Sequence, residues 1–506
     1  MIYLNGVHLS IKDVIAVVRN DLQVALDPDQ LELVKQSRRQ VEKLVRRGDP
    51  IYGINTGFGK LADTSISPSN VEKLQRNLIL SHSSGVGQSL SLEIVKAMML
   101  LRANALMKGY SGIRAEVIQL LIDMVNRSVI PVVPAQGSVG ASGDLVPLAH
   151  MSAVLIGEGQ AFYNNQVMPG REALMEAGLE PVVLQSKEGL ALINGTQNMT
   201  AHGVIGIYDA WILMKTADIA GALTMEALQA LPNSIDERVH ILRPHGGQMV
   251  SARNLRRILS GSKLVSSLSN HRVQDAYSLR CIPQVHGASR DVLQFVEKTI
   301  ETEINSVTDN PIIFSHDGDV ISAGNFHGQP VAFALDFLGI TLGELGNISE
   351  RRIERMVNPQ LSGLPPFLVL DSGLNSGYMI SQYTAAALVS ENKILAHPAS
   401  VDSIPTSANQ EDHVSMGAIA ARKMLRILTN VRNILSIEIL CACQALEFCD
   451  RSKLASATSS VYGFIRKQVP PLTEDRCLEP EIRLVHDLIF SEEIVNIVDD
   501  CIGKID

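Results

Sequence analysis

The 506-residue chain has few aromatic side chains: Phe, Tyr and Trp make up only 4% of it, with a single Trp. Ala, Leu, Ile and Met are abundant instead, a composition that favours helices over sandwiches or barrels. The length is sufficient for a large buried core. We therefore predict a mainly α fold, with a bundle of long helices as its core and a loop-rich N-terminal part.

The chain also lacks a basic patch. Its formal net charge is -9, and Lys and Arg are scattered singly, so we expect no nucleic-acid partner. None of the cysteines belongs to a paired CxxC motif, and Met1–Asn5 has no charged segment followed by an apolar one. These features predict free thiols in a reducing cytoplasm. The cysteines are Cys281, Cys441, Cys443, Cys449, Cys477 and Cys501.

Long uninterrupted apolar runs are missing too. The most apolar window, Val204–Leu223, contains Asp209, Lys215 and Asp218, so we expect no membrane span. The histidines show no consistent metal-ligand spacing, and the sequence predicts no catalytic metal.

The chain has no internal repeat and no linker rich in Pro, Gly or Ser. We expect residues 1–200 to form an N-terminal part and residues 201–506 a central and C-terminal helical bundle, together folding as one cooperative unit. Helical spacing of apolar residues predicts helices over the following ranges: 93–107, 113–124, 331–357, 377–395 and a long one within 418–462, where neither Gly nor Pro occurs. Helices of this length need partners, which favours an oligomer.

The most informative segment is Ala141-Ser142-Gly143, within a glycine-rich run from Gly137 to Leu145. In a tight turn, the Gly143 amide nitrogen can attack the Ala141 carbonyl carbon, since glycine tolerates backbone conformations that other residues resist. Loss of water there, and of the Ser142 hydroxyl as a second water, would give a methylidene-imidazolone (MIO). This group is an electrophile, and no ordinary side chain is one.

Five further polar motifs lie in predicted loops or at helix ends, and each alone has an ordinary structural explanation. They are Tyr52–Gly59, Leu80–Gly85, Leu192–Gln197, Gln274–Cys281 and Ser407–Met416. Within Gln274–Cys281 the three-residue spacing predicts Gln274, Tyr277 and Arg280 on one side of a helical turn.

Together, the motifs from Tyr52 to Met416 make the chain resemble the MIO-dependent aromatic amino acid ammonia-lyases and aminomutases over nearly its whole length. This resemblance implies a lyase that removes ammonia from an amino acid substrate. Its N-terminal part would be catalytic, with MIO formed from Ala141, Ser142 and Gly143 and no external cofactor. It also implies a homotetramer whose sites are shared between subunits.

The resemblance further implies a role for each matched residue. Tyr52 would be the general base, with its pKa lowered from about 10 by nearby positive charge or hydrogen bonds. Arg280 would hold the substrate carboxylate. Asn194, Gln274 and Tyr277 would surround the electrophile and the substrate amine. Phe326 would form an aromatic wall, and Asp144 would assist cyclisation.

His82 and Glu411 resemble the histidine-specific branch of the family. A carboxylate can accept the N–H of an imidazole, and a phenylalanine-selective pocket would leave a buried Glu411 unpaired. The implied reaction converts L-histidine to trans-urocanate and ammonia, the first step of histidine degradation.

Three alternatives remain open from the sequence. One is a tyrosine or phenylalanine ammonia-lyase or aminomutase with the same prosthetic group. Another is a serine hydrolase using Ser142 with Asp144 and His150, although the Gly-x-Ser-x-Gly pattern is incomplete here. The third is an inactive helical scaffold.

Overall fold

The computed structural model describes the chain except for residues 48–50, 58, 62, 65 and 266–272. Its described part contains twenty α-helices and nine short strands, which confirms the predicted mainly α fold. The residues form two compact units: unit 1 is 1–205, 297–336 and 398–422, and unit 2 is 206–296, 337–397 and 423–506. The expected division at residue 200 and the single cooperative unit stay predictions.

Unit 1 contains short and medium helices around the nearly fully buried α4. The helices that lie wholly in this unit are α1 (Ile11–Asn20), α2 (Pro28–Arg47), α3 (Val71–His82), α4 (Leu92–Met107), α5 (Ala115–Asn126), α6 (Leu145–Leu155), α7 (Gly170–Glu176) and α8 (Glu188–Ile193). The predicted helices at 93–107 and 113–124 are confirmed as α4 and α5.

The described strands of unit 1 form four small sheets. Only the first sheet is parallel, and it pairs β1 (Ile2–Leu4) with β2 (Val24–Leu26). The antiparallel sheets pair β3 (Val86–Ser89) with β5 (Pro134–Gln136), β6 (Gln160–Tyr163) with β4 (Ile130–Pro131) and β7 (Gln166–Pro169), and β8 (Ile312–Phe314) with β9 (Asp319–Ile321).

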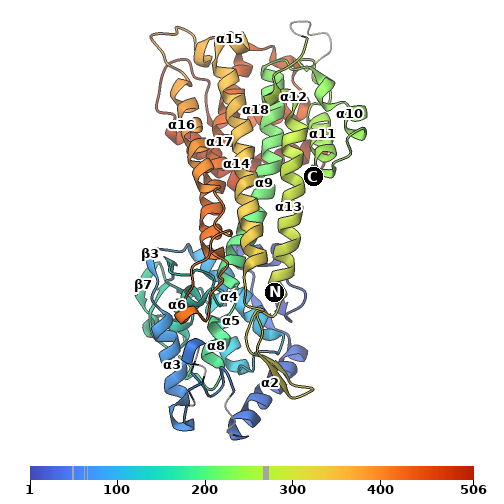
Figure 1. Ribbon diagram of the computed structural model, residues 1–506. Helices are drawn as coiled ribbons and strands as arrows, with labels where there is room; N and C mark the ends of the chain where they lie inside the picture. The colour runs from blue at the N-terminus through green and yellow to red at the C-terminus, as the bar shows by residue number, and fades with distance from the viewer. Residues whose placement is uncertain (48–50, 58, 62, 65, 266–272) are drawn as a thin grey trace. The chain divides into compact units, whose positions relative to one another are not determined.

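The four longest described helices lie side by side in unit 2 (Figure 1). They are α9 (Gln197–Ala227), α13 (Ile282–Ile304), α14 (Gln329–Val357) and α17 (Gly417–Ala445), and each has residues in both units. Glycine permits close packing: a Cβ at Gly346 in α14 would lie 3.2 Å from Val431 and 3.1 Å from Ile434 in α17. The helix predicted over 331–357 is confirmed as α14.

Shorter helices complete unit 2. They are α10 (Glu237–Ile241), α11 (Gly246–Ile258), α12 (Tyr277–Arg280), α15 (Pro359–Ser362), α16 (Met379–Leu395), α18 (Ser456–Gln468), α19 (Glu479–Phe490) and α20 (Glu493–Ile502). α16 confirms most of the helix predicted over 377–395.

The long helix predicted within 418–462 is wrong in part, because α17 ends at Ala445. Cys449 adopts an extended conformation, with φ -111° and ψ 161°. The Asp450 side chain then accepts the Ser452 N–H and begins a separate 3₁₀ turn. Because this break uses neither Gly nor Pro, the sequence pattern did not reveal it.

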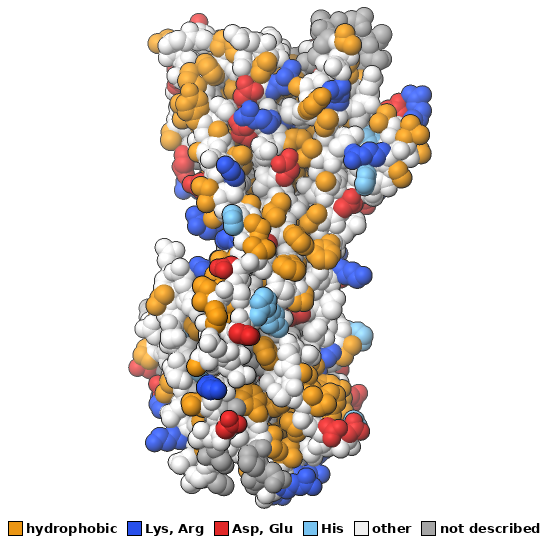
Figure 2. Space-filling model, in the orientation of Figure 1, with side chains coloured by type: hydrophobic (Ala, Val, Ile, Leu, Met, Phe, Trp, Pro, Cys, Tyr) orange, Lys and Arg blue, Asp and Glu red, His pale blue; other side chains and the backbone are white. Residues whose placement is uncertain are grey.

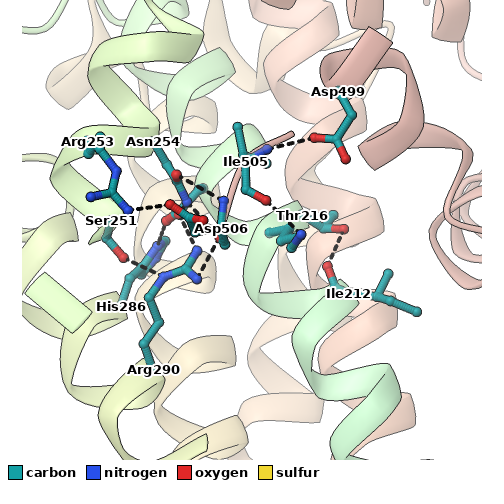
Figure 3. A network of polar contacts seen from close by, with 12 residues as sticks. Ile212, Thr216, Ser251, Arg253, Asn254, His286, Arg290, Asp499, Ile505 and Asp506 are labelled. Atoms are coloured by element: carbon teal, nitrogen blue, oxygen red, sulfur yellow. Dashed lines mark hydrogen bonds and ion pairs between the residues drawn. The ribbon is translucent and has the colours of Figure 1, made fainter. Parts of the chain in front are cut away.

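Unit 2 also contains a network of buried charges (Figure 3). Arg290 donates to Asp218 at 2.6 Å and to the Ser251 hydroxyl at 2.9 Å, and His286 Nδ1 lies 2.8 Å from Asp218. The other nitrogen of His286 faces Arg352 at 3.4 Å, and an arginine can only donate. His286 is therefore neutral with its proton on Nδ1, in agreement with burial lowering its pKa.

α14 is also the one helix in the described part of the chain that is long and apolar enough to cross a membrane. However, 67% of its most apolar window is buried inside the protein. Core helices pass the same test of length and composition, so this helix is weak evidence for a membrane span.

Candidate active site

Two other segments of unit 1 contact the turn that contains Ala141-Ser142-Gly143. On one side, the Met416 N–H donates to the Val139 carbonyl at 2.9 Å, and the Ser142 hydroxyl donates to Glu411 Oε1 at 2.9 Å. On the other side, the Asp144 N–H donates to the Gly195 carbonyl at 2.7 Å. The turn is therefore held between the segments 194–199 and 411–416.

The fold admits only glycine at position 143. Gly143 has φ +70°, and a Cβ built on it would lie 2.2 Å from the Gly195 oxygen. Side chains larger than hydrogen are strained in this conformation, and the contact leaves no space for one. A tight turn at the predicted cyclising residue is thus fixed both by conformation and by packing.

Asn194 follows directly after α8 and contacts the same turn. Its Nδ2 donates to the Ser142 carbonyl at 3.1 Å. Its Oδ1 is buried, and the structure records no hydrogen bond to it. A buried acceptor without a partner is costly, so this atom suits a ligand that carries an N–H donor.

Asp144 is fully buried and directly precedes α6, and its carboxylate contacts the first turn of α9. One carboxylate oxygen accepts the Met199 N–H at 2.9 Å, so the side chain caps one of the unpaired amides of that helix. Burial raises the pKa of Asp144 to about 7, although hydrogen bonds from Met199, Asn198 and Ser138 oppose this shift. The group can therefore gain or lose a proton near neutral pH.

Glu411 belongs to a strained loop. The Thr406 hydroxyl donates to its Oε2 at 2.8 Å, and the two residues also pair through their backbones. Between them, Ser407, Ala408 and Asn409 all have positive φ, from 50° to 67°. Such conformations persist only where surrounding contacts enforce them, and they are common at functional sites.

Tyr52 lies in the loop between α2 and α3. Its phenol oxygen accepts the Gly59 N–H at 3.4 Å, while Phe58 in the same motif lies outside the described residues. Burial raises the pKa of Tyr52, and the charges of Glu411 and Asp309 raise it further. Within the single chain the charges that act on the phenol are those of the acidic Glu411 and Asp309. The expected lowering of this pKa therefore stays a prediction for the complete site.

His82 is the last residue of α3 and is half-buried. Its Nδ1 lies 3.1 Å from the Ser81 hydroxyl. Burial lowers the pKa of His82, so the ring is neutral at pH 7. Phe326, which is also half-buried, lies in the turn that precedes α14.

The geometry disfavours a serine hydrolase. His150 Nε2 accepts the Gly85 N–H at 3.0 Å, so its acceptor atom already has a partner. The Ser142 hydroxyl donates to Glu411 instead. A serine nucleophile requires a histidine base within hydrogen-bonding reach, and His150 does not take that place.

The remaining predicted residues belong to unit 2 and form their own cluster. Arg280 donates from Nη1 to Gln274 Oε1 and lies 4.8 Å from the centre of the Tyr277 ring. The predicted shared helical turn is wrong for Gln274, which precedes α12, although the three side chains still meet. Tyr277 is 70% exposed, and Arg280 Nε is a buried donor without a recorded partner.

Sequence reasoning missed two residues that support the site, Thr406 and Arg102. Thr406 contacts Glu411 as described above. Arg102 is fully buried in α4 and bonds to Gln197, next to the Asn194–Gly195 turn. The sequence did offer one indication, because Arg102 is the only charged residue in the mostly apolar stretch 97–107.

Among the residues described, no group of three or more His, Cys, Asp or Glu side chains is placed to hold a metal ion. The site instead combines a glycine-rich turn, an orphaned amide oxygen and a carboxylate.

Known proteins resemble the chain over nearly its full length. The family model for aromatic amino acid lyases matches residues 9–467. A histidine ammonia-lyase of Symbiobacterium thermophilum is 56% identical over 501 residues, which cover 99% of each chain. A solved histidine ammonia-lyase structure from Trypanosoma cruzi is 42% identical, with a TM-score of 0.92 and coverage of 99% of this chain and 95% of that one. For a tyrosine aminomutase of Streptomyces globisporus the identity is 36%, the TM-score 0.95 and the coverage 99% and 98%. The chain belongs to the aromatic amino acid lyase family.

Proposed function

We propose that this enzyme removes ammonia from L-histidine without oxidation and releases trans-urocanate, using MIO formed from Ala141, Ser142 and Gly143. The observation that carries the proposal is the 2.9 Å hydrogen bond between Ser142 and Glu411. It joins the predicted electrophile-forming residue to a carboxylate that can bind an imidazole. The relatives named histidine ammonia-lyase support the same substrate.

The residues around the turn fit this prosthetic group. Gly143 lies against Gly195 where no Cβ fits, and Asn194 Nδ2 donates to the Ser142 carbonyl, which would become the exocyclic carbonyl of the imidazolone. Asp144 lies directly beside the cyclising residues. Because its carboxyl group can exchange a proton near pH 7, this side chain is suited to assist cyclisation. Once formed, the group supplies an electrophile for the substrate amine.

The other site residues bind the substrate and move its protons. Asn194 Oδ1, which has no recorded partner, would accept an N–H of the substrate amine. Arg280 would bind the carboxylate through its planar guanidinium, with Gln274 and Tyr277 beside it. Phe326 would line the pocket as an apolar wall.

Tyr52 would take the β-proton as the general base. Because burial and two nearby carboxylates raise its pKa within the single chain, a cation must be added when the site is complete. We propose that a neighbouring subunit supplies this positive charge.

Glu411 and His82 would select histidine. One oxygen of Glu411 is engaged by Thr406, and the other points to Ser142, so the second oxygen becomes available when the Ser142 hydroxyl leaves. This oxygen can accept the imidazole N–H, and the neutral His82 ring can bond to the other side of the substrate. A tyrosine or phenylalanine lyase or aminomutase remains the second candidate, since a tyrosine aminomutase shares the fold.

We propose a homotetramer with sites shared between subunits, as the family resemblance implies, and exposed apolar side chains support contacts between subunits. Figure 2 shows hydrophobic side chains gathered over long helices of the visible face. Phe295 of α13 and Phe337 of α14, with ring centres 5.9 Å apart, are 50% and 43% exposed. Exposed apolar patches of this kind mark subunit interfaces.

We also propose a cytoplasmic location and no membrane or nucleic-acid partner. All six cysteines are free thiols, as expected in a reducing compartment.

The test is the intact mass of the purified chain, followed by an assay for urocanate from L-histidine. A mass short by two waters, restored in Ser142→Ala, together with urocanate formation, is the expected result. If the modified enzyme instead forms products from tyrosine or phenylalanine, the second candidate replaces the first. An unmodified mass in folded, soluble protein would overturn the lyase proposal.

A further inference from the structure

Arg102 is a fully buried cation whose recorded hydrogen bonds go only to neutral groups. Its Nε donates to the Ala191 carbonyl at 2.9 Å, and its Nη1 donates to Gln197 Oε1 at 2.9 Å. Burial lowers the pKa of Arg102 to about 10, so the side chain remains charged at neutral pH. The charge of Asp309 partly opposes this shift, but no hydrogen bond or ion pair joins Asp309 to Arg102 in the described structure. Burying a charge without such a pair is costly, which calls for a specific reason.

The bonds of Arg102 converge on the turn that contains Gly195. A Cβ built on Gly195 would lie 2.5 Å from Arg102 Nη1, 2.3 Å from Gln197 Oε1 and 2.8 Å from Thr308 Oγ1. These three side chains are themselves joined, since Gln197 also donates to Thr308 at 2.9 Å. A connected, buried polar wall therefore lies directly behind Gly195.

The other side of Gly195 faces the cyclising turn. Its carbonyl accepts the Asp144 N–H at 2.7 Å, and its oxygen occupies the space where a Gly143 Cβ would be. Gly195 is thus enclosed between the polar wall and Gly143, with no side chain on either glycine to absorb movement. A displacement of the wall would move the Gly143 backbone.

The charge of Arg102 suits this task. Ala191 lies near the C-terminal end of α8, where carbonyl groups carry partial negative charge and have no partner within the helix. Two nitrogens of the guanidinium bond to this one carbonyl while the third bonds to Gln197. A lysine would keep the charge but lose this planar arrangement of donors.

We propose that Arg102 is a positioning residue for formation of the prosthetic group, and that it holds the Asn194–Gly195 turn against Gly143. The inference rests on the proposed function. In the assisted step, the Gly143 nitrogen bonds to the Ala141 carbonyl carbon. The Ala141 oxygen then leaves as water with the amide hydrogens of Gly143 and Ser142, and a C=N bond to the Ser142 nitrogen results. The second water takes the Ser142 hydroxyl and its α-hydrogen, with no change in net oxidation.

The test is the rate of cyclisation in Arg102→Lys, read as intact mass rather than activity. Expression is stopped after a short burst, and the mass of soluble full-length chain is then followed with time. We expect the rate at which Arg102→Lys loses its two waters to be about tenfold lower, or lower still, than that of the original chain. A loss of this size is expected when a hydrogen bond to a charged group is weakened in a transition state.

Arg352→Lys is the matched control. Arg352 is also fully buried but bonds to Glu438 in unit 2, so the same substitution lowers stability without touching the turn. We expect it to cyclise at the original rate. If Arg102→Lys is insoluble, Gln197→Met takes its place, since it removes the acceptor of Nη1.

Cyclisation of the Arg102 or Gln197 variant at the original rate would overturn the inference. Equal slowing in Arg352→Lys would overturn it too, because the effect would then reflect stability alone. If the unsubstituted chain never loses two waters, the proposed function itself fails, and this outcome is distinct from the others.

Discussion

The Thr406 hydroxyl donates a 2.8 Å hydrogen bond to Oε2 of Glu411, and the same two residues pair through their backbones. The three residues from Ser407 to Asn409 that bring them together all have positive φ. The orientation of the carboxylate is therefore fixed by a strained loop whose ends are tied to each other.

Thr406→Val keeps the shape of this side chain and removes the hydroxyl. Glu411 should then rotate more freely, and kcat/KM for L-histidine should fall about tenfold, the effect of losing one hydrogen bond to a charged group. Steady-state kinetics would measure this, with Thr406→Ser as the control that retains activity. An unchanged kcat/KM in Thr406→Val would show that the hydroxyl does not orient Glu411.

Glu411→Ala removes the carboxylate that we assign to the imidazole ring. Turnover of L-histidine should fall by about 10²-fold or more, because the imidazole N–H of the substrate loses a charged acceptor. The mass deficit of two waters should persist, since Glu411 is not part of the turn that cyclises. Near-normal turnover of histidine would refute the assignment of Glu411 and with it the main evidence for this substrate.

Gly143→Ala tests the requirement for glycine in the turn. A Cβ at this position would lie 2.2 Å from the Gly195 oxygen, in a backbone conformation with φ +70°. We expect a chain without the mass deficit and without lyase activity. Gly324→Ala, where a Cβ meets no atom within 4 Å, is the matched substitution and should keep the deficit. Full cyclisation of Gly143→Ala would contradict the geometry described here.

Asp144→Asn tests the pH dependence that follows from burial. The folded chain holds a proton on Asp144 up to about pH 7, whereas the usual carboxyl pKa is 3.8. Between about pH 4 and 7 the native state thus binds more protons than the unfolded state, and this group's contribution to stability falls as pH rises through that window. Above pH 7 the loss is complete, at about 4 kcal/mol at most.

The asparagine variant lacks this titration. Its melting temperature relative to that of the original chain should therefore be higher at pH 8 than at pH 5. Differential scanning calorimetry at one protein concentration would measure the difference, since subunit association also affects the melting temperature. If the difference in melting temperature between the variant and the original chain does not change between pH 5 and pH 8, Asp144 is already ionised throughout this range.

The sequence predicted the helices whose apolar spacing is continuous, such as α4, α14 and α16. It could not predict the break after Ala445, because Asp450 begins the next turn through a side-chain hydrogen bond that no spacing pattern encodes. Motif resemblance identified Ser142, Asn194 and Glu411, and the structure brings these three together.

Other properties of the site depend on burial and could not be predicted from motifs. Burial raises the pKa of Tyr52, and the charges of the neighbouring Glu411 and Asp309 raise it further. Arg102 has no motif of its own, since its role comes from contacts with residues about 90 positions along the chain. Tertiary contacts of this kind appear only once the chain is folded.

The interleaved course of the chain has a consequence for evolution and engineering. The backbone passes between the two units five times, and four of these passages lie inside α9, α13, α14 and α17 rather than in loops. Neither unit can therefore be excised, exchanged with a relative or expressed alone by cutting at a loop. Neither unit is a transferable module, and we expect variants to be made by substitution within an intact chain.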